Sequence, residues 1–409
     1  MQTTLSDRAR QLPGAEAAEA VLRTCVHCGF CNATCPTYQL LGDERDGPRG
    51  RIYIIKQMLE TGEAHASTRL HLDRCLTCRN CETTCPSGVR YSRLLDVGRL
   101  TVDAWAPPRA VGARLQRRLL RAALPHAALV KVLVATGRAL RFLLPSRLAD
   151  KLPRAKPSRH PHPAGGHARA VLMLEGCVQP ALSPATNAAA ARVLDRLGIG
   201  VVPAPHAGCC GAVDFHLDAQ DAGLDRARRN IDAWWPAIEA GAEAVVVTAS
   251  GCGAFVKDYG HLLRDDPAYA TKATRVSALA KDLVELLRDE PLERLRARGS
   301  ARIAFHCPCT LQHAQKLGGA VEAVLTRLGF ELTPVADGHL CCGSAGTYSL
   351  TQPALSRQLR DRRLDALERG GPALIATANI GCQMHLDGAR RTPVTHWIEV
   401  VADGMDAMD

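Results

Sequence analysis

The sequence predicts an α/β protein with a mainly α-helical N-terminal domain, and three observations support this fold class. Eight cysteines fall within residues 1–104, and nine more follow residue 166 in a different pattern. The second half repeats itself, with short apolar runs alternating with Ala-, Leu- and Arg-rich runs of helical length, which is typical of parallel sheets covered by helices. A chain of 409 residues also exceeds one ordinary core.

These patterns divide the chain into four segments. The first is a two-cluster ferredoxin-like domain, and the second is a basic amphipathic helical segment that ends in a linker with Pro153, Pro157, Pro161 and Pro163. Two cysteine-rich α/β modules follow, each built around the tripeptide CCG. The predicted boundaries are 1–104, 105–165, 166–295 and 296–409.

Two matched runs of four cysteines carry the strongest signal in the N-terminal segment. CVHCGFCNATCP begins at Cys25 and CLTCRNCETTCP begins at Cys75, and both follow the spacing C-x2-C-x2-C-x3-C-P. This spacing is typical of two-cluster ferredoxins, in which the fourth cysteine of each run ligates the other cluster. The predicted ligands are therefore Cys25, Cys28, Cys31 and Cys85 for a first [4Fe-4S] cluster, and Cys75, Cys78, Cys81 and Cys35 for a second.

The alternative for these runs is a pair of zinc ribbons, since C-x2-C is also a zinc spacing. Zinc does not explain the third cysteine of each run or the Cys-Pro ending. Between the runs, GPRGRIYIIKQML predicts a turn that enters an amphipathic helix. Arg49 and Arg51 there either offset the negative charge of a cluster or lie at a solvated helix start, and both interpretations stay open.

The second segment concentrates the positive charge of the chain. The whole chain carries 51 basic and 41 acidic residues, but between Trp105 and His160 Asp150 is the one acidic residue. Such a local excess argues against a protein-wide nucleic-acid surface. No uncharged window here approaches the length of a membrane span. Two interpretations stay open: a helix that lies on an anionic membrane, or a basic helix docked on a partner or on the protein's own domain.

The second half contains two copies of one unit. HAGCCG at 206–211 corresponds to GHLCCG at 338–343, and the apolar and helical runs around them correspond as well. The glycine after each cysteine pair predicts a tight turn at which the backbone approaches something bulky. Loops at strand ends converge in α/β folds, so four thiols per copy form a hypothetical further metal or cluster site, with inert loop-supporting thiols as the alternative. These residues are Cys177, Cys209, Cys210 and Cys252, and Cys309, Cys341, Cys342 and Cys382.

Several motifs are absent from the sequence. There is no G-x-G-x-x-G, no Walker-type loop and no G-x-S-x-G. We therefore expect no FAD or NAD in this chain, no catalytic residue of its own, and a partner that performs the two-electron chemistry. The first 24 residues also lack the basic and apolar regions of a secretory signal, so we expect reduced thiols in a cytoplasmic setting.

Two ferredoxin runs followed by two CCG repeats resemble two groups of proteins: the iron–sulfur subunits of flavin-dependent hydroxyacid oxidoreductases and the cysteine-rich subunits of heterodisulfide reductase. Within the first group, the sequence most closely resembles the glycolate oxidase iron–sulfur subunits. The resemblance spans nearly the whole chain and is weakest in the basic linker. It rests on the strings TCVHCGFCNATCPTY, GPRGRIY, ASGCGAFVKDYGH, CPCTLQH, LCCGSAGTYSLTQPALSRQLRDRRL and IGCQMHL.

The resemblance implies a three-subunit complex in which FAD-binding subunits oxidise glycolate to glyoxylate. This chain would pass the electrons toward a respiratory quinone, as a peripheral protein on the cytoplasmic face of the inner membrane. The disulfide-reducing relatives end each repeat in C-x-x-C, but here Ala249 and Asn379 stand at the first cysteine position, which argues against heterodisulfide reduction. The alternatives are the equivalent subunit of anaerobic glycerol-3-phosphate dehydrogenase or of a lactate-utilisation complex, and a zinc-stabilised non-redox assembly scaffold.

Overall fold

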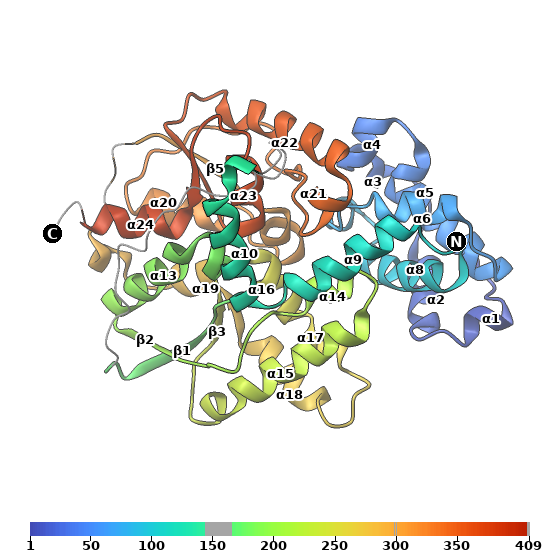
Figure 1. Cartoon of the computed structure of the whole chain (residues 1–409), viewed down its shortest axis with the longest axis horizontal. Helices are drawn as coiled ribbons and strands as arrows, with labels where there is room; N and C mark the ends of the chain where they lie inside the picture. The colour runs from blue at the N-terminus through green and yellow to red at the C-terminus, as the bar shows by residue number, and fades with distance from the viewer. Residues whose placement is uncertain (144–165, 298, 300, 407–409) are drawn as a thin grey trace. The chain divides into compact units, whose positions relative to one another are not determined.

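The structure of the chain is a computed structural model that describes residues 1–143, 166–297, 299 and 301–406. By packing, the chain forms two compact units (Figure 1). Unit 1 comprises Met1–Gln116 and His339–Arg363, and unit 2 comprises Arg117–Gly338 and Leu364–Asp409. The four segments predicted from sequence patterns stay a prediction, and the predicted proline-containing linker lies outside the described residues.

Unit 1 is helical in its described part. Helices α2, α5 and α8 pack together around a core that includes Leu22, Ile55 and Leu94, all fully buried. Gly98 lets α8 approach α5 closely, because a Cβ atom there would lie 2.8 Å from the Ile55 side chain. The helices are α1 (Asp7–Arg10), α2 (Ala15–Thr24), α3 (Phe30–Ala33), α4 (Pro36–Leu41), η1 (Glu44–Asp46), α5 (Pro48–Thr61), α6 (Ala66–Asp73), α7 (Asn80–Thr84), α8 (Tyr91–Trp105) and α21 (Tyr348–Thr351).

The first sheet of unit 2 contains four parallel strands in the order β2-β1-β3-β4. Strand β1 shows why these segments are strands: Val171 and Met173 enter one hydrophobic core, and Leu172 and Leu174 enter the core on the other face. Nearly continuous apolar sequence is expected of a sheet covered on both faces. The strands are β1 (Arg169–Leu174), β2 (Ile199–Val202), β3 (Val245–Val247) and β4 (Ala280–Asp282).

The second sheet repeats this arrangement with the parallel order β5-β6-β7. In the second copy, a parallel bridge between Ile303 and Leu332 takes the place of the β1–β2 pairing of the first copy. Apolar residues of both sheets share one core, so the two copies fold against each other. The predicted α/β class with a duplicated parallel-sheet module is confirmed. The strands are β5 (Ile303–His306), β6 (Leu374–Thr377) and β7 (Val394–His396).

Helices cover both sheets of unit 2. Helices α13, α19, α20 and α24 contribute to the core shared by the two sheets, and α15 to α18 cover the other face of the first sheet. The helices are α12 (Gln179–Leu182), α13 (Pro184–Arg196), α14 (Ala212–His216), α15 (Gln220–Glu239), α16 (Ser250–Lys257), α17 (Tyr259–Leu262), α18 (Ala270–Leu279), α19 (Leu283–Leu287), η3 (Leu292–Leu295), η4 (Thr310–Ala314), α20 (Ala320–Arg327), α23 (Ile380–Asp387) and α24 (Trp397–Asp406). Helix α22 (Pro353–Glu368) runs from unit 1 into unit 2.

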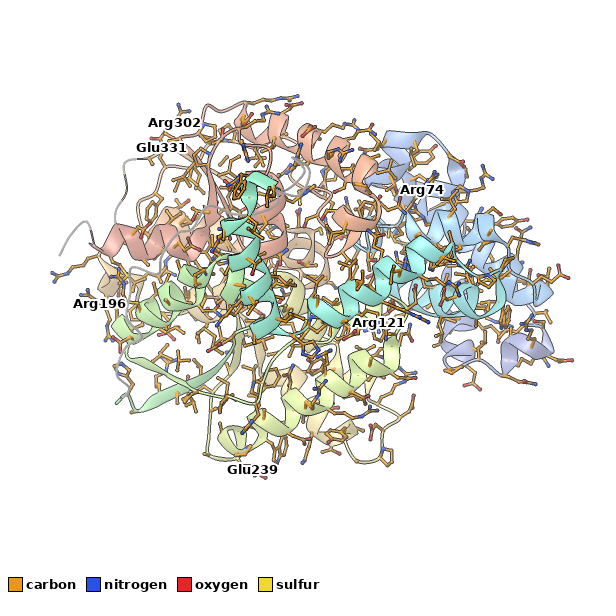
Figure 2. The ribbon with its side chains drawn as sticks, in the orientation of Figure 1. Arg74, Arg121, Arg196, Glu239, Arg302 and Glu331 are labelled. Carbon is orange, nitrogen blue, oxygen red and sulfur yellow. The ribbon has the colours of Figure 1, made fainter. Side chains whose placement is uncertain are left out.

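The basic segment forms helices α9 (Val111–Ala123) and α10 (Ala127–Ala139) and a short turn η2 (Arg141–Leu143). Arg117 pairs with Asp218 at 2.5 Å, and Arg121 (labelled in Figure 2) lies 3.5 Å from Asp214. Part of the basic face of α9 therefore docks on the protein's own domain, which agrees with the second of the two interpretations of the sequence. No single described helix is long and apolar enough to cross a membrane, although the bent pair α9 and α10 passes that test by length and composition together.

Candidate iron–sulfur centres

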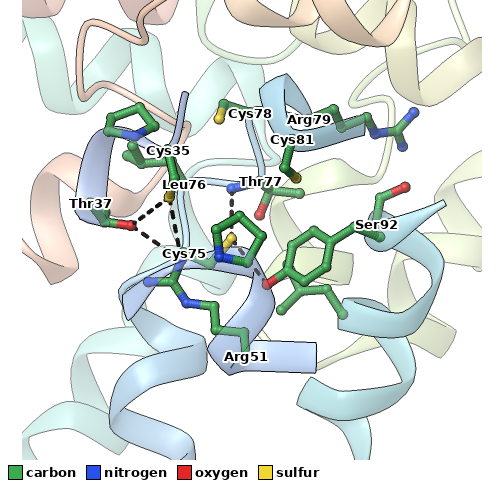
Figure 3. Close-up of a pocket in the computed structure, with 14 residues that line it drawn as sticks. Cys35, Thr37, Arg51, Cys75, Leu76, Thr77, Cys78, Arg79, Cys81 and Ser92 are labelled. Atoms are coloured by element: carbon green, nitrogen blue, oxygen red, sulfur yellow. Dashed lines mark hydrogen bonds between the residues drawn. The ribbon is translucent and has the colours of Figure 1, made fainter. Parts of the chain in front are cut away.

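Four of the predicted thiols border one hollow in unit 1. The hollow is lined by Cys75, Cys78 and Cys81 of the second run together with Cys35 of the first run (Figure 3). Cys35, Cys75 and Cys81 are buried, and Cys78 is half-buried. This is the crossed set predicted for the second cluster.

The other four thiols border a second hollow in the same unit. Cys25, Cys28 and Cys31 of the first run meet Cys85 of the second, and Cys81 also reaches the edge. Cys28 is exposed to solvent, whereas Cys25 is buried. The structure thus brings together both sets of four that the spacing predicts.

The two cysteine runs adopt the same local conformation. His27 and Gly29 in the first run have φ angles of 59° and 86°, and their counterparts Thr77 and Arg79 have φ angles of 54° and 59°. Left-handed residues at alternate positions turn each loop back so that its thiols face one side. The short helices α3 and α7 that follow these loops pack together.

A proline follows the fourth cysteine of each run and directs the chain away from the loop of that run. Cys35 precedes Pro36, the first residue of α4, and proline favours that position because its fixed φ suits a helix start. Thr34 and Thr84, which precede the fourth cysteines, lie with their hydroxyls 3.0 Å apart. This contact joins the two runs where they exchange ligands, so neither loop is complete without the other.

The electrostatics of the thiols fit a metal cluster. Burial, and then the charges of Cys25, Cys85 and Cys28, raise the pKa of Cys31 to about 11. Burial, and then the charges of Cys78 and Cys75, also raise the pKa of Cys81 well above its usual value. Several thiolates this close need positive charge among them, which iron ions supply. The donor set therefore suits iron–sulfur clusters.

A buried ion network lies against the second set. Arg51 of α5 is 1% exposed, and its Nη1 lies 4.0 Å from Cys35 Sγ and donates to Thr37 Oγ1 at 3.1 Å (Figure 3). Burial alone would lower the pKa of the guanidinium, but the charges of Cys75, Cys35 and Asp46 outweigh this effect and raise the pKa above its usual range. Arg51 is therefore buried beside the thiols of the second set and does not lie at a solvated helix start.

Asp46 is the counter-charge of this network and is fully buried. Its carboxylate accepts from Arg51 at 3.4 Å, from Arg74 at 2.8 Å, and lies 3.0 Å from His71 Nδ1. Arg49, by contrast, is one-third exposed and pairs with Glu44 beside the first set. The two sets of thiols therefore have different electrostatic surroundings.

Part of the second CCG repeat packs within unit 1. Asn80 Nδ2 donates to the Thr34 carbonyl at 2.9 Å and to the His339 carbonyl at 3.1 Å, and the Tyr348 hydroxyl donates to the Arg74 carbonyl at 3.2 Å. Burial raises the pKa of Tyr348, and the charges of Cys75 and Cys341 add to this effect. The loop that carries Cys341 and Cys342 thus lies beside the second set of thiols.

The four thiols of the first CCG copy converge in unit 2. Cys177 and Cys210 donate to Cys209, and Cys210 also interacts with Cys252. The hydrogen bonds from Cys177 and Cys210 lower the pKa of Cys209. In the second copy, Cys341 and Cys342 belong to unit 1, whereas Cys309 and Cys382 belong to unit 2.

The glycines of the two CCG turns behave as predicted. Gly211 has a φ of 101°, and a Cβ atom there would lie 2.3 Å from the Gly223 carbonyl oxygen. Gly343 has a φ of 86°, and a Cβ atom there would lie 2.7 Å from the Ser356 carbonyl oxygen. Both the left-handed backbone and the close approach require glycine.

Comparison with known proteins gives matches over the length of the chain. Residues 21–89 match a 4Fe-4S dicluster domain, and residues 171–257 and 303–387 each match a cysteine-rich domain. The glycolate oxidase iron-sulfur subunit of Escherichia coli (strain K12) is 63% identical over 406 residues, which cover 99% of this chain and 100% of that protein. The chain belongs to the glycolate oxidase iron–sulfur subunit family.

Two further relatives are more distant. A Bacillus subtilis (strain 168) protein, "Probable glycolate oxidase iron-sulfur subunit", is 28% identical over 90% of this chain and 89% of its own length. Lactate utilization protein A of Exiguobacterium sp. is 25% identical over 58% of this chain and 98% of its own length. The 4Fe-4S dicluster match identifies residues 21–89 as an iron–sulfur module rather than a pair of zinc ribbons.

Sequence reasoning missed several residues that shape the sites of this family member. His71 and Arg74 each contact Asp46, 25 and 28 positions away in sequence, and no spacing pattern connects them. The Tyr91 hydroxyl donates to Cys75 Sγ at 3.7 Å and has no sequence signal either. The run of charged residues before the GPRGRIY string, DERD at 43–46, was the one available clue to a carboxylate near Arg51.

Proposed function

We propose that the chain is the electron-transfer subunit of a glycolate oxidase complex, in which it accepts electrons from FAD-binding subunits and delivers them to a respiratory quinone. Cys25, Cys28, Cys31 and Cys85 would hold one [4Fe-4S] cluster, and Cys75, Cys78, Cys81 and Cys35 a second. Each cluster, when bound, would supply reversible one-electron chemistry. The observation that carries the proposal is the convergence of these crossed sets around two hollows.

The surface beside the first set suits a flavoprotein partner. Val26 and Phe30 flank the exposed Cys28 and are 67% and 62% exposed, and Tyr53 of α5 is 46% exposed. Apolar and aromatic side chains on a surface mark docking sites. The second set is more deeply buried and adjoins the loop of the second CCG repeat. These differences favour entry of electrons at the first set and exit through the second.

The test uses the chain purified with its flavoprotein partner. Glycolate added without oxygen is expected to bleach the broad cluster absorbance near 400 nm, and a quinone analogue is expected to restore it. Lactate and glycerol 3-phosphate serve as competing substrates. The proposed electron path is wrong if glycolate leaves the clusters oxidised in a complex whose flavoprotein is still active, as shown by reduction of an artificial dye that takes electrons from the flavin. If only lactate or only glycerol 3-phosphate bleaches the clusters, the chain is instead the iron–sulfur subunit of the oxidoreductase for that substrate.

The converging thiols of the first CCG copy support a further metal or cluster site at Cys177, Cys209, Cys210 and Cys252. Cys177, Cys209 and Cys210 are buried and Cys252 is half-buried, and the interactions among their thiols form a sulfur-rich donor set that suits zinc or iron. The corresponding set of the second copy, Cys309, Cys341, Cys342 and Cys382, stays a prediction from the sequence repeat. Metal analysis is expected to find zinc, or iron beyond the about eight ions that two [4Fe-4S] clusters hold. About eight iron and no zinc per chain would rule out this extra site.

We expect the complex to lie on the cytoplasmic face of the inner membrane. A quinone dissolves in the lipid phase, so a chain that reduces it must work at the membrane surface. The segment predicted for peripheral contact, 105–160, is described as far as Leu143.

A further inference from the structure

We propose that α10 and η2 bind the surface of an anionic phospholipid bilayer through an outward apolar face formed by Leu129, Val132, Leu133, Leu140, Phe142 and Leu143. This proposal names the surface through which the proposed quinone-directed role meets the membrane, and its physiological meaning rests on that role. The six residues are between 42% and 80% exposed. They make up six of the fourteen exposed large hydrophobic side chains in the described chain, although they fall within fifteen positions of sequence.

The helix α10 is apolar on two faces. Its inner face is accounted for, because Val130 and Val134 are buried against Ala181 and Leu182 of the first CCG module. The outer face places Leu129, Leu133 and Leu140 at helical spacing in solvent. An apolar helix face is normally buried against another surface. The inner face has its partner within the chain, so the outer face takes another.

Charge identifies the chemistry of that partner. Lys131, Arg138 and Arg141 lie in the same segment as the apolar face, and no Asp or Glu occurs between Trp105 and Asp150. Two arginines of α9 are already paired with Asp218 and Asp214, so the neighbouring carboxylates of this domain are neutralised. An exposed apolar face on a segment that carries basic and no acidic residues suits acyl chains beneath anionic headgroups.

The composition favours lipid over a protein partner. The face is aliphatic apart from Phe142, and it contains neither Tyr nor Trp. Energetically dominant residues of protein interfaces are enriched in Trp, Tyr and Arg, and Leu and Val are under-represented among them. Helix α10 has 13 residues and is therefore about 20 Å long, which is too short to cross a hydrocarbon core of about 30 Å. It would therefore lie in the plane of the interface.

The experiment measures binding of the cluster-loaded chain to vesicles. Vesicles of phosphatidylcholine with about one-third phosphatidylglycerol are sedimented with the protein, and pure phosphatidylcholine vesicles serve for comparison. We expect binding to the anionic vesicles that weakens at high salt. The double substitution Val132→Glu with Leu133→Glu should reduce binding at least about tenfold. Leu70→Glu is the matched control, since Leu70 is a 44% exposed leucine on another helix, and it should bind as the native chain does.

Cluster absorbance near 400 nm in each variant shows that it has folded, and glycolate-dependent bleaching with the flavoprotein tests the proposed function separately from lipid binding. Failure of the native chain to bind anionic vesicles, or equal binding by the double variant, would overturn the proposal. If the double variant keeps vesicle binding but no longer co-elutes with the flavoprotein, the face is a subunit interface and the lipid assignment is wrong.

Discussion

Replacing Cys35 with alanine is expected to remove the cluster whose other three ligands lie 40 or more positions later in the chain, and to leave the cluster of its own run in place. The reason is geometric, because Cys35 borders the hollow of Cys75, Cys78 and Cys81 and not that of Cys25, Cys28 and Cys31. A cluster that loses one of four thiolates loses most of its binding. Iron per chain should fall from about eight to about four.

Two double variants make the test decisive. Cys35→Ala with Cys78→Ala removes two ligands of one crossed set and should leave about four iron per chain. Cys28→Ala with Cys35→Ala takes one ligand from each set and should leave almost none. Ligation within each run predicts the opposite order, so iron analysis of the two variants separates the models. The matched single variants Cys28→Ala and Cys78→Ala control for loss of folding, because each should keep about half of the iron.

This pairing was predictable from sequence because it depends on local spacing. Three cysteines at two-residue intervals fix one loop, and the Cys-Pro step directs the fourth thiol away from it. The same holds for the turns at Gly211 and Gly343, where the tripeptide CCG already implied a left-handed glycine. The two parallel sheets were predictable from the repeat, because each copy alternates apolar runs with helical runs. In each case the information lies within a few residues of the feature.

Features that depend on distant packing were not predictable in this way. Asp46 meets His71 and Arg74 only because η1 and α6 pack together. The loop around Cys341 and Cys342 repeats the first copy in sequence, yet it belongs to unit 1 while most of its own module belongs to unit 2. The basic helix α9 allowed two interpretations, because its Arg117 has no sequence link to Asp218, about one hundred positions away. Charge alone did not choose between them.

The second large effect concerns the reduction potential of the cluster held by Cys35, Cys75, Cys78 and Cys81. Arg51→Met is expected to lower this potential, because reduction adds negative charge to the cluster and the variant lacks the buried cation that stabilises it. At an effective dielectric constant of about 20, unit charges about 4 Å apart interact by about 4 kcal/mol. The interaction energy with the whole cluster is smaller, because most of the cluster lies farther away and Asp46 carries an opposite charge. We therefore expect the potential to shift by on the order of 100 mV, or about 2.3 kcal/mol for one electron.

Asp46→Asn is expected to shift the same potential upward, because it removes the negative charge and keeps the cation. It should also destabilise unit 1 by about 3 to 5 kcal/mol, since Arg51 would remain buried without a carboxylate partner. Loss of stability alone cannot produce potential shifts of opposite sign in the two variants. A redox titration followed by electron paramagnetic resonance measures both shifts. The Cys28→Ala background lets the second cluster be observed without the first.

Arg49→Met provides the matched comparison on the same helix. Arg49 borders the hollow of the first set, but its side chain is 34% exposed and already pairs with Glu44. Solvent screening weakens its effect on a cluster, so the first potential should move much less than the second does in Arg51→Met. Equal shifts in the two variants, or shifts of the same sign in Arg51→Met and Asp46→Asn, would contradict a specific role of the buried guanidinium. The asymmetry bears on the proposed electron path, because a buried cation would raise the potential of the second cluster relative to that of the more exposed first one.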